Sequence, residues 1–590
     1  MHLFEFRRIG NLLILTAIAW ICVSGRSALT AADLPIADFS LQTHRGQRTS
    51  LNDFADRKLI VIAFLGTQCP LAKLYGPRLA ELHGEYSDRG VAFVGINSNT
   101  QDSITEITAY VNRHEIPFPV LKDPGNRVAD QFGAERTPEV FVLDQNRKVR
   151  YRGRIDDQYL VGLSRDRVRR RDLAIAIEEL LSGNEASVTE TEAIGCHIGR
   201  IQKVEPTGDV TYANQISRIF NSRCLECHRD GQIAPFSLAG YADTIGWEDT
   251  ILEVIADNRM PPWYANPDHG TFRNDARLSD DEKQLIRTWV ENGMPEGDPS
   301  QLPDPPEFAT GWRMPQPDQV IAMSDEAFTV PATGVVNYQY FSVDPGWTED
   351  KFVTAAEARP DNFGVVHHII AYAIPPGDEE ERKKQRTMLV GYAPGATPNV
   401  LDDGIAMYIP AGSTLLFEMH YTPNGSQQSD RSHIGLKFTE KKNVRKLLQG
   451  RVAMEADFEI PAGASNHEVT AEYRARRDEL LLCMTPHMHV RGRSFRFEAF
   501  YPDGGQEILL DVPKYDFNWQ LNYRLSEPKL LPKGTRILCT AAFDNSDANP
   551  VNPDPGRSVR WGDQSWEEMM IGFLDVVEPD AAASASSAEH

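Results

Sequence analysis

At 590 residues the chain is too long for one hydrophobic core, because cores stop growing at about 250–300 residues, so several domains are expected. Apolar residues make up 41 % and charged residues 25 % of the chain, as in ordinary globular proteins, which excludes disorder, collagen and coiled coil as descriptions of the whole. The net charge is −23, from 84 acidic and 61 basic side chains, so the chain repels phosphate backbones and no nucleic acid is expected as a partner.

Residues 1–32 predict an export signal. Arg7 and Arg8 precede an apolar run from Ile9 to Val23, and Thr30-Ala31-Ala32 fits a small-x-small cleavage site. The run is shorter than the roughly 20 residues that a spanning helix needs. An uncleaved membrane anchor is the alternative, and only in that form is the protein expected on a membrane. In both cases the rest of the chain is exported, to the periplasm or the extracellular space.

Residues 34–183 alternate strand and helix signals, which is typical of an α/β domain. Strands are expected over 59–65, 91–96, 140–143 and 149–151, and helices over 77–86 and 170–181. After the first of these strands, Gly66-Thr67-Gln68-Cys69-Pro70 opens a helix. A cysteine at a helix N-terminus has a lowered pKa, because the backbone N–H groups favour the thiolate.

The motif around Cys69, together with Arg136-Thr137-Pro138-Glu139 before a later strand, resembles the thioredoxin-like redoxins, including the thiol-specific antioxidant proteins of the AhpC/TSA type. The resemblance implies a thioredoxin-like fold in which Pro138 is a cis-proline that faces Cys69. Ala72 stands where a thioredoxin has its second cysteine, so dithiol exchange within the motif is excluded. Cys196 is then the candidate resolving cysteine. The alternative is a retained scaffold without thiol activity.

Residues 184–208 are polar and predict a linker, and residues 209–300 predict a small helical domain. Within this domain, Cys224-Leu-Glu-Cys227-His228 is a C-x-x-C-H motif. Two thiols on one turn can add to both vinyl groups of a haem, and the adjacent histidine can then bind the iron. A zinc site is the alternative, but it needs two more Cys or His ligands at matching spacing.

The helical segment resembles the cytochromes c. The resemblance implies an all-α domain with one c-type haem, bound covalently by Cys224 and Cys227. It also implies that His228 and a later methionine are the axial ligands. Met260, which precedes two prolines, is favoured, and Met294 near the end of the segment is its rival. A thioether ligand raises the haem potential, which suits an electron carrier.

From about residue 320 to 578 the sequence consists of short strands separated by Pro/Gly turns. This pattern predicts two β-sandwiches, over 320–460 and 461–578. The small polar residues of 579–590 predict a disordered tail.

Histidines recur along the β region, and their spacing indicates metal binding. Alternate residues of a strand share a face, so His487 and His489 can bind one ion. His367 and His368 are adjacent, and on an ideal strand they point in opposite directions. These two can share an ion only at a bulge or at a strand end.

Four motifs of the β region, in this order, resemble those of the copper type II, ascorbate-dependent monooxygenases, the family of peptidyl-glycine hydroxylase and dopamine hydroxylase. They are Val366-His367-His368-Ile369, Phe417-Glu418-Met419-His420-Tyr421, Pro486-His487-Met488-His489 and Glu567-Glu568-Met569. The resemblance implies two jelly-roll-like sandwiches and two copper ions. It implies that the first copper, held by His367, His368 and His420, stores an electron. It implies that the second copper, held by His487, His489 and Met569, activates O₂, with Met570 as the alternative to Met569.

The chain departs from peptidyl-glycine hydroxylase where that enzyme holds its substrate carboxylate. Thr485, Ile571 and Phe573 stand at the positions of its arginine, asparagine and tyrosine, so a C-terminal glycine peptide is not the expected substrate and a more apolar pocket is expected. The family also pairs a cysteine at the position of Cys539, but Met570 holds the partner position here. Cys539 therefore either pairs with Cys483, or both are buried free thiols.

Together the motifs predict an exported, multidomain redox protein. An external donor, ascorbate or a redox protein, would reduce the haem, which would pass electrons to the first copper. The second copper would then use O₂ to hydroxylate a C–H bond of a small molecule or peptide. The alternative is an electron-transfer or thiol-redox protein, such as a thiol peroxidase or redox sensor, whose copper sites are not used for hydroxylation.

Overall fold

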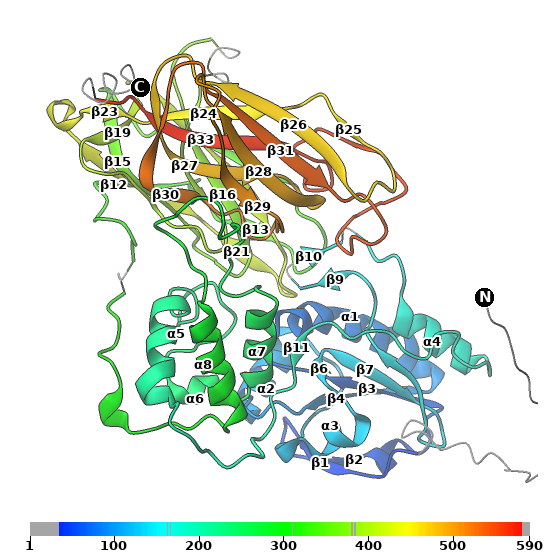
Figure 1. Ribbon diagram of the computed structural model, residues 1–590. Coiled ribbons are helices and arrows are strands. Elements are labelled where there is room, and N and C mark those ends of the chain that lie inside the picture. The colour runs from blue at the N-terminus through cyan, green and yellow to red at the C-terminus, as the bar shows by residue number, and fades with distance from the viewer. Residues whose placement is uncertain are drawn as a thin grey trace, which may run out of the picture.

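The computed structural model describes residues 35–580 except 162, 166, 309–310, 379–381 and 383–384. The predicted export signal and most of the predicted tail lie outside the described residues. Among the residues that are described, no helix is both long and apolar enough to cross a membrane. Figure 1 shows an α/β unit in blue and cyan and a group of green helices side by side, with the β-rich part of the chain above both.

The N-terminal unit is a seven-stranded sheet with helices on its faces, in the order β2-β1-β5-β4-β3-β7-β8. Its strands are β1 (Ser40–Thr43), β2 (Arg48–Ser50), β3 (Leu59–Phe64), β4 (Val91–Asn97), β5 (Val120–Lys122), β7 (Glu139–Leu143) and β8 (Val149–Gly153). Its helices are α1 (Pro70–Tyr86), α2 (Ile104–Arg113), α3 (Arg127–Phe132) and α4 (Asp172–Leu181). Alternate residues of β3 enter two separate cores, because a sheet covered on both faces buries both sets of side chains.

The predicted α/β arrangement is thus confirmed, with one difference at the helix that carries the cysteine motif. Helix α1 begins at Pro70, where the cysteine motif predicted a helix start, and continues through Pro77, the first residue of the helical segment predicted over 77–86. Proline is favoured in the first helical turn because its missing N–H would have no partner there, and this signal places the start directly after Cys69.

The segment predicted as a linker, 184–208, is hydrogen-bonded to the α/β unit. Its strand β11 (Cys196–His197) pairs antiparallel with β6 (Arg136–Thr137), a short strand of the α/β unit. Upstream, the backbone N–H of Arg152 donates to Thr189 O at 2.9 Å. Ile198 is only 1 % exposed and belongs to a core of the α/β unit. Backbone pairing therefore holds this polar stretch against the unit that precedes it.

The next part of the chain is helical, as predicted for 209–300. It contains the π-helical turn η5 (Tyr212–Ile216) and the helices α5 (Ser217–Arg223), α6 (Tyr241–Thr244), α7 (Glu248–Ala256) and α8 (Asp280–Glu291). These elements pack around Phe220, Trp289 and Met294. Helix α8 starts with a capping box, in which Ser279 and Glu282 satisfy each other's backbone N–H groups.

The β-rich part consists of two pairs of sheets, each pair enclosing one core. The first pair has the strand orders β12-β22-β15-β19-β23 and β14-β20-β16-β17. Its strands are β12 (Gln319–Ala322), β14 (Gln339–Val343), β15 (Lys351–Arg359), β16 (Val366–Ile374), β17 (Thr387–Tyr392), β19 (Ile405–Ile409), β20 (Thr414–Tyr421), β22 (His433–Thr439) and β23 (Lys446–Leu447), with β18 (Asn399–Val400) beside β15 and β13 (Phe328–Val330) paired with β21 (Gln428–Asp430). Strand β20 alternates between buried and partly exposed residues, which is the pattern of a strand with one face on a core.

The second pair has the strand orders β24-β33-β27-β30 and β26-β31-β28-β29. Its strands are β24 (Gln449–Met454), β26 (His467–Arg474), β27 (Glu479–His487), β28 (Gly492–Phe500), β29 (Gln506–Val512), β30 (Tyr523–Leu531), β31 (Arg536–Phe543) and β33 (Ile571–Val577), with β25 (Glu459–Ile460) paired to β32 (Val559–Arg560). The boundary predicted between 460 and 461 is therefore wrong. Strand β24 pairs with β33 of the second unit, so the first unit ends before Gln449. Strand propensity marks where a strand lies, but only pairing shows which sheet receives it.

The parts of the chain are joined by specific contacts. Arg136 Nη2 of the α/β unit lies 2.7 Å from Glu253 Oε2 on α7. His114 Nδ1 lies 3.2 Å from Gly425 O in the first β unit, and Arg165 Nη2 donates to Pro550 O in the second at 2.7 Å. The α/β unit therefore contacts the helical part and both β units.

Candidate thiol, haem and copper sites

Cys69 lies at the first turn of α1 and is 1 % exposed. As a thiol, its Sγ donates to Thr137 O at 2.8 Å. The Thr137–Pro138 peptide bond is cis, so Pro138 has the isomer that the resemblance implied. Gly66 approaches the same place so closely that a Cβ there would lie 2.9 Å from Thr137 Oγ1.

Cys196 reaches the same site from the segment after the α/β unit. In the β6–β11 pairing it lies directly opposite Thr137, whose carbonyl accepts from Cys69. Both cysteines are free thiols. Cys196 packs against the core of the α/β unit and against that of the helical part. The structure thus brings together the two cysteines that the sequence placed far apart.

The surroundings give the two thiols opposite acidities. Burial alone raises the pKa of Cys69, but hydrogen bonds from Cys196, Ala72 and Thr137 outweigh it and lower the pKa to about 6. The N-terminal turn of a helix favours an anion in the same way. The hydrogen bond with Cys69 and then burial raise the pKa of Cys196 well above its ordinary value. Cys69 is therefore the thiolate at neutral pH and Cys196 the thiol.

We expect the thiolate absorbance of the reduced protein to rise in one step centred near pH 6, because Cys69 is protonated below this pH and ionised above it. The step should be absent in Cys69→Ser. In Cys196→Ala it should move to higher pH, because the hydrogen bond from the Cys196 side chain to the thiolate is lost. An ultraviolet pH titration of the three proteins measures this, and a wild-type protein without any step below pH 8 would contradict the assignment.

The C-x-x-C-H motif begins where α5 ends. Cys224 follows the last residue of α5, and the backbone N–H of His228 donates to Cys224 O at 2.9 Å. Burial raises the pKa of Cys224 to about 12 and that of Cys227 to about 11, so both are neutral thiols. His228 Nδ1 lies 3.1 Å from Phe236 O. When Nδ1 donates to this carbonyl, Nε2 remains available for a metal. These residues fit a covalently attached haem.

The two candidate methionines have different surroundings. Met294 is fully buried in the helical core, where its Sδ accepts from Gln202 Nε2 at 3.5 Å and its carbonyl accepts from Tyr241 Oη at 2.9 Å. Met260 is only partly buried and lies in the loop after α7. A side chain that already fills a core is less available as a ligand, which favours Met260 for the axial position.

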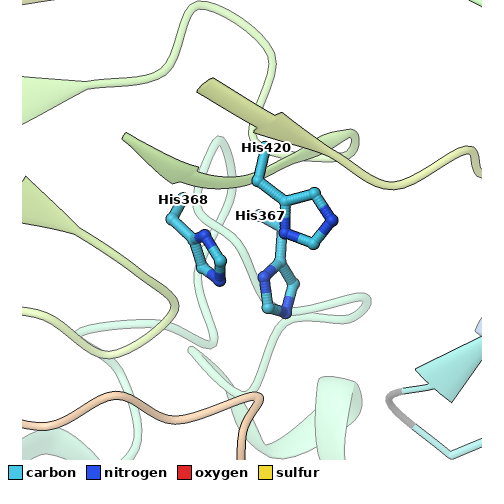
Figure 2. A group of neighbouring side chains, drawn as sticks. All are labelled: His367, His368 and His420. Atoms are coloured by element: carbon cyan, nitrogen blue, oxygen red, sulfur yellow. The ribbon is translucent and has the colours of Figure 1, made fainter. Parts of the chain in front are cut away.

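His367, His368 and His420 converge at the edge of the first β unit (Figure 2). Strand β16 pairs with β20 so that His368 lies directly opposite His420. The register shifts between Val366 and His368, which makes His367 the extra residue of a β-bulge. A bulge re-aims a side chain, and this allows two adjacent histidines to face one point.

The cluster has the features of a metal site. One ligand nitrogen of each histidine lies within 4.8 Å of the others. The buried Nδ1 atoms of His367 and His420 have no hydrogen-bond partner. Burial lowers the pKa of His367 to about 4 and also lowers the pKa of His420, so the rings are neutral and can act as ligands. A buried nitrogen without a partner costs free energy, and a bound metal would remove that cost.

His487 and His489 form a second pair at the end of β27. Their ring centroids are 5.4 Å apart. Each Nδ1 is already engaged, in His487 by Gln520 Oε1 at 2.7 Å and in His489 by Glu567 O at 3.2 Å. Both rings therefore keep Nε2 for a ligand. Hydrogen bonds to the second ring nitrogen are the usual way in which proteins orient metal-binding histidines.

The choice between the neighbouring methionines follows from burial. Met570 is fully buried in the core of the second β unit, and Met488, between the two histidines, is buried there too. Met569 is only partly buried. Met569 thus stays the candidate thioether ligand, and Met570 has a packing role.

Gln520 lies between the two histidine sets. Its Oε1 contacts His487 Nδ1, and its Nε2 lies 2.9 Å from His368 Nε2. Phe517 packs between the sets as well, with ring centroids 5.6 Å from His367 and 5.9 Å from His489. Sequence reasoning missed both residues, since an amide and a phenyl ring in a loop carry no ligand pattern.

Beside the first histidine set lies a cavity of about 90 Å³ between the two β units. His367 and His420 line one side, and the walls include Val335, Val490 and Trp566. The lining also includes Arg165, Asn518 and Ser565, so the walls are of mixed polarity and the cavity is not the apolar pocket that the sequence predicts.

The structure also bears on the expected state of Cys483 and Cys539 and on the position of the substrate clamp. Cys483 and Cys539 are both buried free thiols, so the first of the two alternatives, a disulfide, is not formed. Thr485, at the position that the resemblance assigns to the clamping arginine of peptidyl-glycine hydroxylase, donates its hydroxyl to Asn522 Oδ1 at 2.8 Å. It offers no positive charge for a substrate carboxylate.

Comparisons with known proteins concern the α/β unit. Residues 33–152 match the AhpC/TSA family. The thiol-disulfide oxidoreductase ResA of Halalkalibacterium halodurans is 25 % identical over 122 residues, which are 21 % of this chain and 68 % of ResA. The thioredoxin-like protein YneN of Bacillus subtilis is 30 % identical over 109 residues, 18 % of this chain and 62 % of YneN, so the match spans less than two thirds of that relative.

Among solved structures, a hypothetical protein from Sinorhizobium meliloti is 30 % identical with a TM-score of 0.25, covering 28 % of this chain and 93 % of that protein. Peroxidoxin BcpB from Mycobacterium tuberculosis is 24 % identical with a TM-score of 0.18, covering 20 % of this chain and 80 % of that protein. The sheet order, the placement of Cys69 and the family match agree with one another. Residues 33–152 are a thioredoxin-like domain of the AhpC/TSA family, carried in a larger multidomain chain.

Proposed function

We propose that the chain is an exported, copper-dependent oxidoreductase that uses O₂ to hydroxylate a C–H bond. The observation that carries the proposal is the convergence of His367, His368 and His420, with two buried Nδ1 atoms that lack a partner. Such a donor set fits copper, because imidazole is a preferred ligand of copper ions. The second pair, with the candidate thioether of Met569, fits Cu(I), which prefers soft ligands.

Bound copper would supply electron storage at the first set and O₂ activation at the second. The protein's own part is to hold these ligands and to shape the space between them. Gln520 fixes the ring of His487 and contacts His368, so one side chain orients both sets. The cavity beside His367 would hold a substrate group against its apolar walls, Val490 and Trp566, with polar side chains such as Asn518 within reach. We therefore expect as substrate a small molecule or a peptide side chain that has both an apolar and a polar part.

The overall reaction consumes two electrons and two protons, R–H + O₂ + 2 e⁻ + 2 H⁺ → R–OH + H₂O. We propose that the electrons come from an external donor, ascorbate or a redox protein, through a haem on Cys224 and Cys227. His228 would bind the haem iron through Nε2, with its ring held by the carbonyl of Phe236.

Metal analysis of the mature chain, produced in a haem-loading host, tests the copper proposal. We expect one haem and two copper ions per chain, and about one copper in His420→Ala or His489→Ala, because each variant removes a ligand of one set. His467→Ala, outside both sets, is the matched control and should keep two. A wild-type chain that binds no copper after reconstitution would overturn the proposal.

The electron route is tested by mixing the fully reduced protein with O₂ in a stopped-flow instrument. If the haem supplies the first copper, haem oxidation should be faster in the copper-loaded chain than in the copper-free chain, and His420→Ala should show the slow rate. Equal rates in all three proteins would contradict this route and leave the copper binding itself untouched.

The haem reduction potential tests which methionine is the axial ligand. A thioether ligand raises the haem potential, so Met260→Ala should lower the reduction potential measured by spectroelectrochemistry. Met294→Ala should keep the potential and instead lower the melting temperature, since deleting a buried methionine side chain costs about 2–5 kcal/mol. The opposite pattern would assign the ligand to Met294.

A second candidate function is thiol–disulfide chemistry in the thioredoxin-like domain. It is favoured by the lowered pKa of Cys69 and by the similarity to proteins named thiol-disulfide oxidoreductases. In this reading the copper sites are not used for hydroxylation. Reductant-dependent peroxide or disulfide turnover that is lost in Cys69→Ser but unchanged in His489→Ala would favour it.

A further inference from the structure

The partner of Cys69 is supplied by another part of the chain. Position 72, where a second cysteine would complete the motif, is Ala72, and Cys196 lies opposite Thr137 across the β6–β11 pair. This close approach depends on Gly195, since a Cβ at this residue would overlap Thr137 O. Arg136 Nη1 also donates to Gly195 O at 2.8 Å and holds the strand in place.

We propose that Cys69 and Cys196 form a dithiol–disulfide couple that reacts with small disulfides and is closed to protein substrates. The proposal deepens the second candidate function and is independent of the copper sites. It assigns the attacking role to Cys69 and the resolving role to Cys196.

The exchange balances with a disulfide as the oxidant. The Cys69 thiolate attacks one sulfur of R–S–S–R, forms a Cys69–S–S–R bond and releases RS⁻. Cys196 loses its proton to water and attacks Cys69 Sγ, which forms the Cys69–Cys196 bond and releases the second RS⁻. One substrate disulfide is reduced to two thiols while two protein thiols are oxidised. A small dithiol reverses both steps.

The substrate class follows from what covers the site. The loop at Gly425 of the first β unit lies against the first turn of α1, so closely that a Cβ at Gly425 would overlap Lys73 O. The same loop contacts His114 Nδ1 through Gly425 O. Cys69 is 1 % exposed beneath this cover.

The other side of the site is closed by the helical part. Glu253 of α7 accepts from Arg136 Nη2 at 2.7 Å and lies 2.6 Å from His197 Nε2. These contacts outweigh burial and lower the pKa of Glu253 to about 2, so it stays charged and the ion pair persists at neutral pH. With neighbours on both sides, the thiols are out of reach of a disulfide held in a folded protein.

The test treats the full, reduced chain with bis(2-hydroxyethyl) disulfide without air and maps the products by peptide mass spectrometry. We expect a Cys69–Cys196 cross-link in the wild type and a mixed disulfide on Cys69 in Cys196→Ser. Gly195→Ala keeps both thiols but displaces β11, so it should also trap the mixed disulfide. Cys483→Ser is the control for the loss of an unrelated buried thiol and should behave as the wild type.

The outcomes distinguish a failure of the Cys69–Cys196 pairing from a failure of the second candidate function. A cross-link that forms equally in Gly195→Ala, or a mixed disulfide that persists in the wild type, overturns the pairing while leaving Cys69 reactive. No modification of Cys69 in any variant overturns the second candidate function itself. Reduction of insulin by the dithiol form at a rate similar to that of the small disulfide overturns the size restriction, and a rate at least tenfold lower supports it.

Discussion

Antiparallel strand pairing sets the geometry of the thiol site and of the first histidine set. The β16–β20 register puts His368 opposite His420, and the bulge at His367 turns a third ring toward them. The β6–β11 register puts Cys196 opposite Thr137, which contacts Cys69. In each case backbone hydrogen bonds fix the register of two strands, and the register positions side chains from segments that are distant in sequence.

Burial favours the neutral form of the side chains at both sites, but the hydrogen-bond donors around them differ. At the histidine cluster, desolvation lowers the pKa of the rings and leaves neutral donors, two of them with an unpartnered nitrogen that a metal would satisfy. At the thiol site, hydrogen bonds to Cys69 outweigh desolvation, and the anion is the stable form. Loss of water therefore leaves neutral rings at the histidine cluster, whereas at the thiol site the hydrogen-bond donors override it and stabilise the thiolate.

The contacts between the parts of the chain matter for both sites. The thioredoxin-like domain meets the helical part through Arg136 and Glu253 and meets the first β unit through His114 and Gly425. The two β units meet at Gln520, which touches a histidine of each set. The thiol site and the two histidine sets thus each include a contact that crosses from one structural unit to another.

The sequence by itself determined the local features, because hydrophobic period, turn residues and short motifs depend on near neighbours. These include strand β3, the position of Cys69 beside a helix start, and the strands that carry His368 and His420. Only the tertiary structure decided what depends on pairing between distant segments: the bulge at His367, the place of Cys196, the sheet that receives β24, and the bridging position of Gln520. The physical reason is that a strand's partner and register are chosen by the free energy of the whole packed sheet, which no local window of sequence contains.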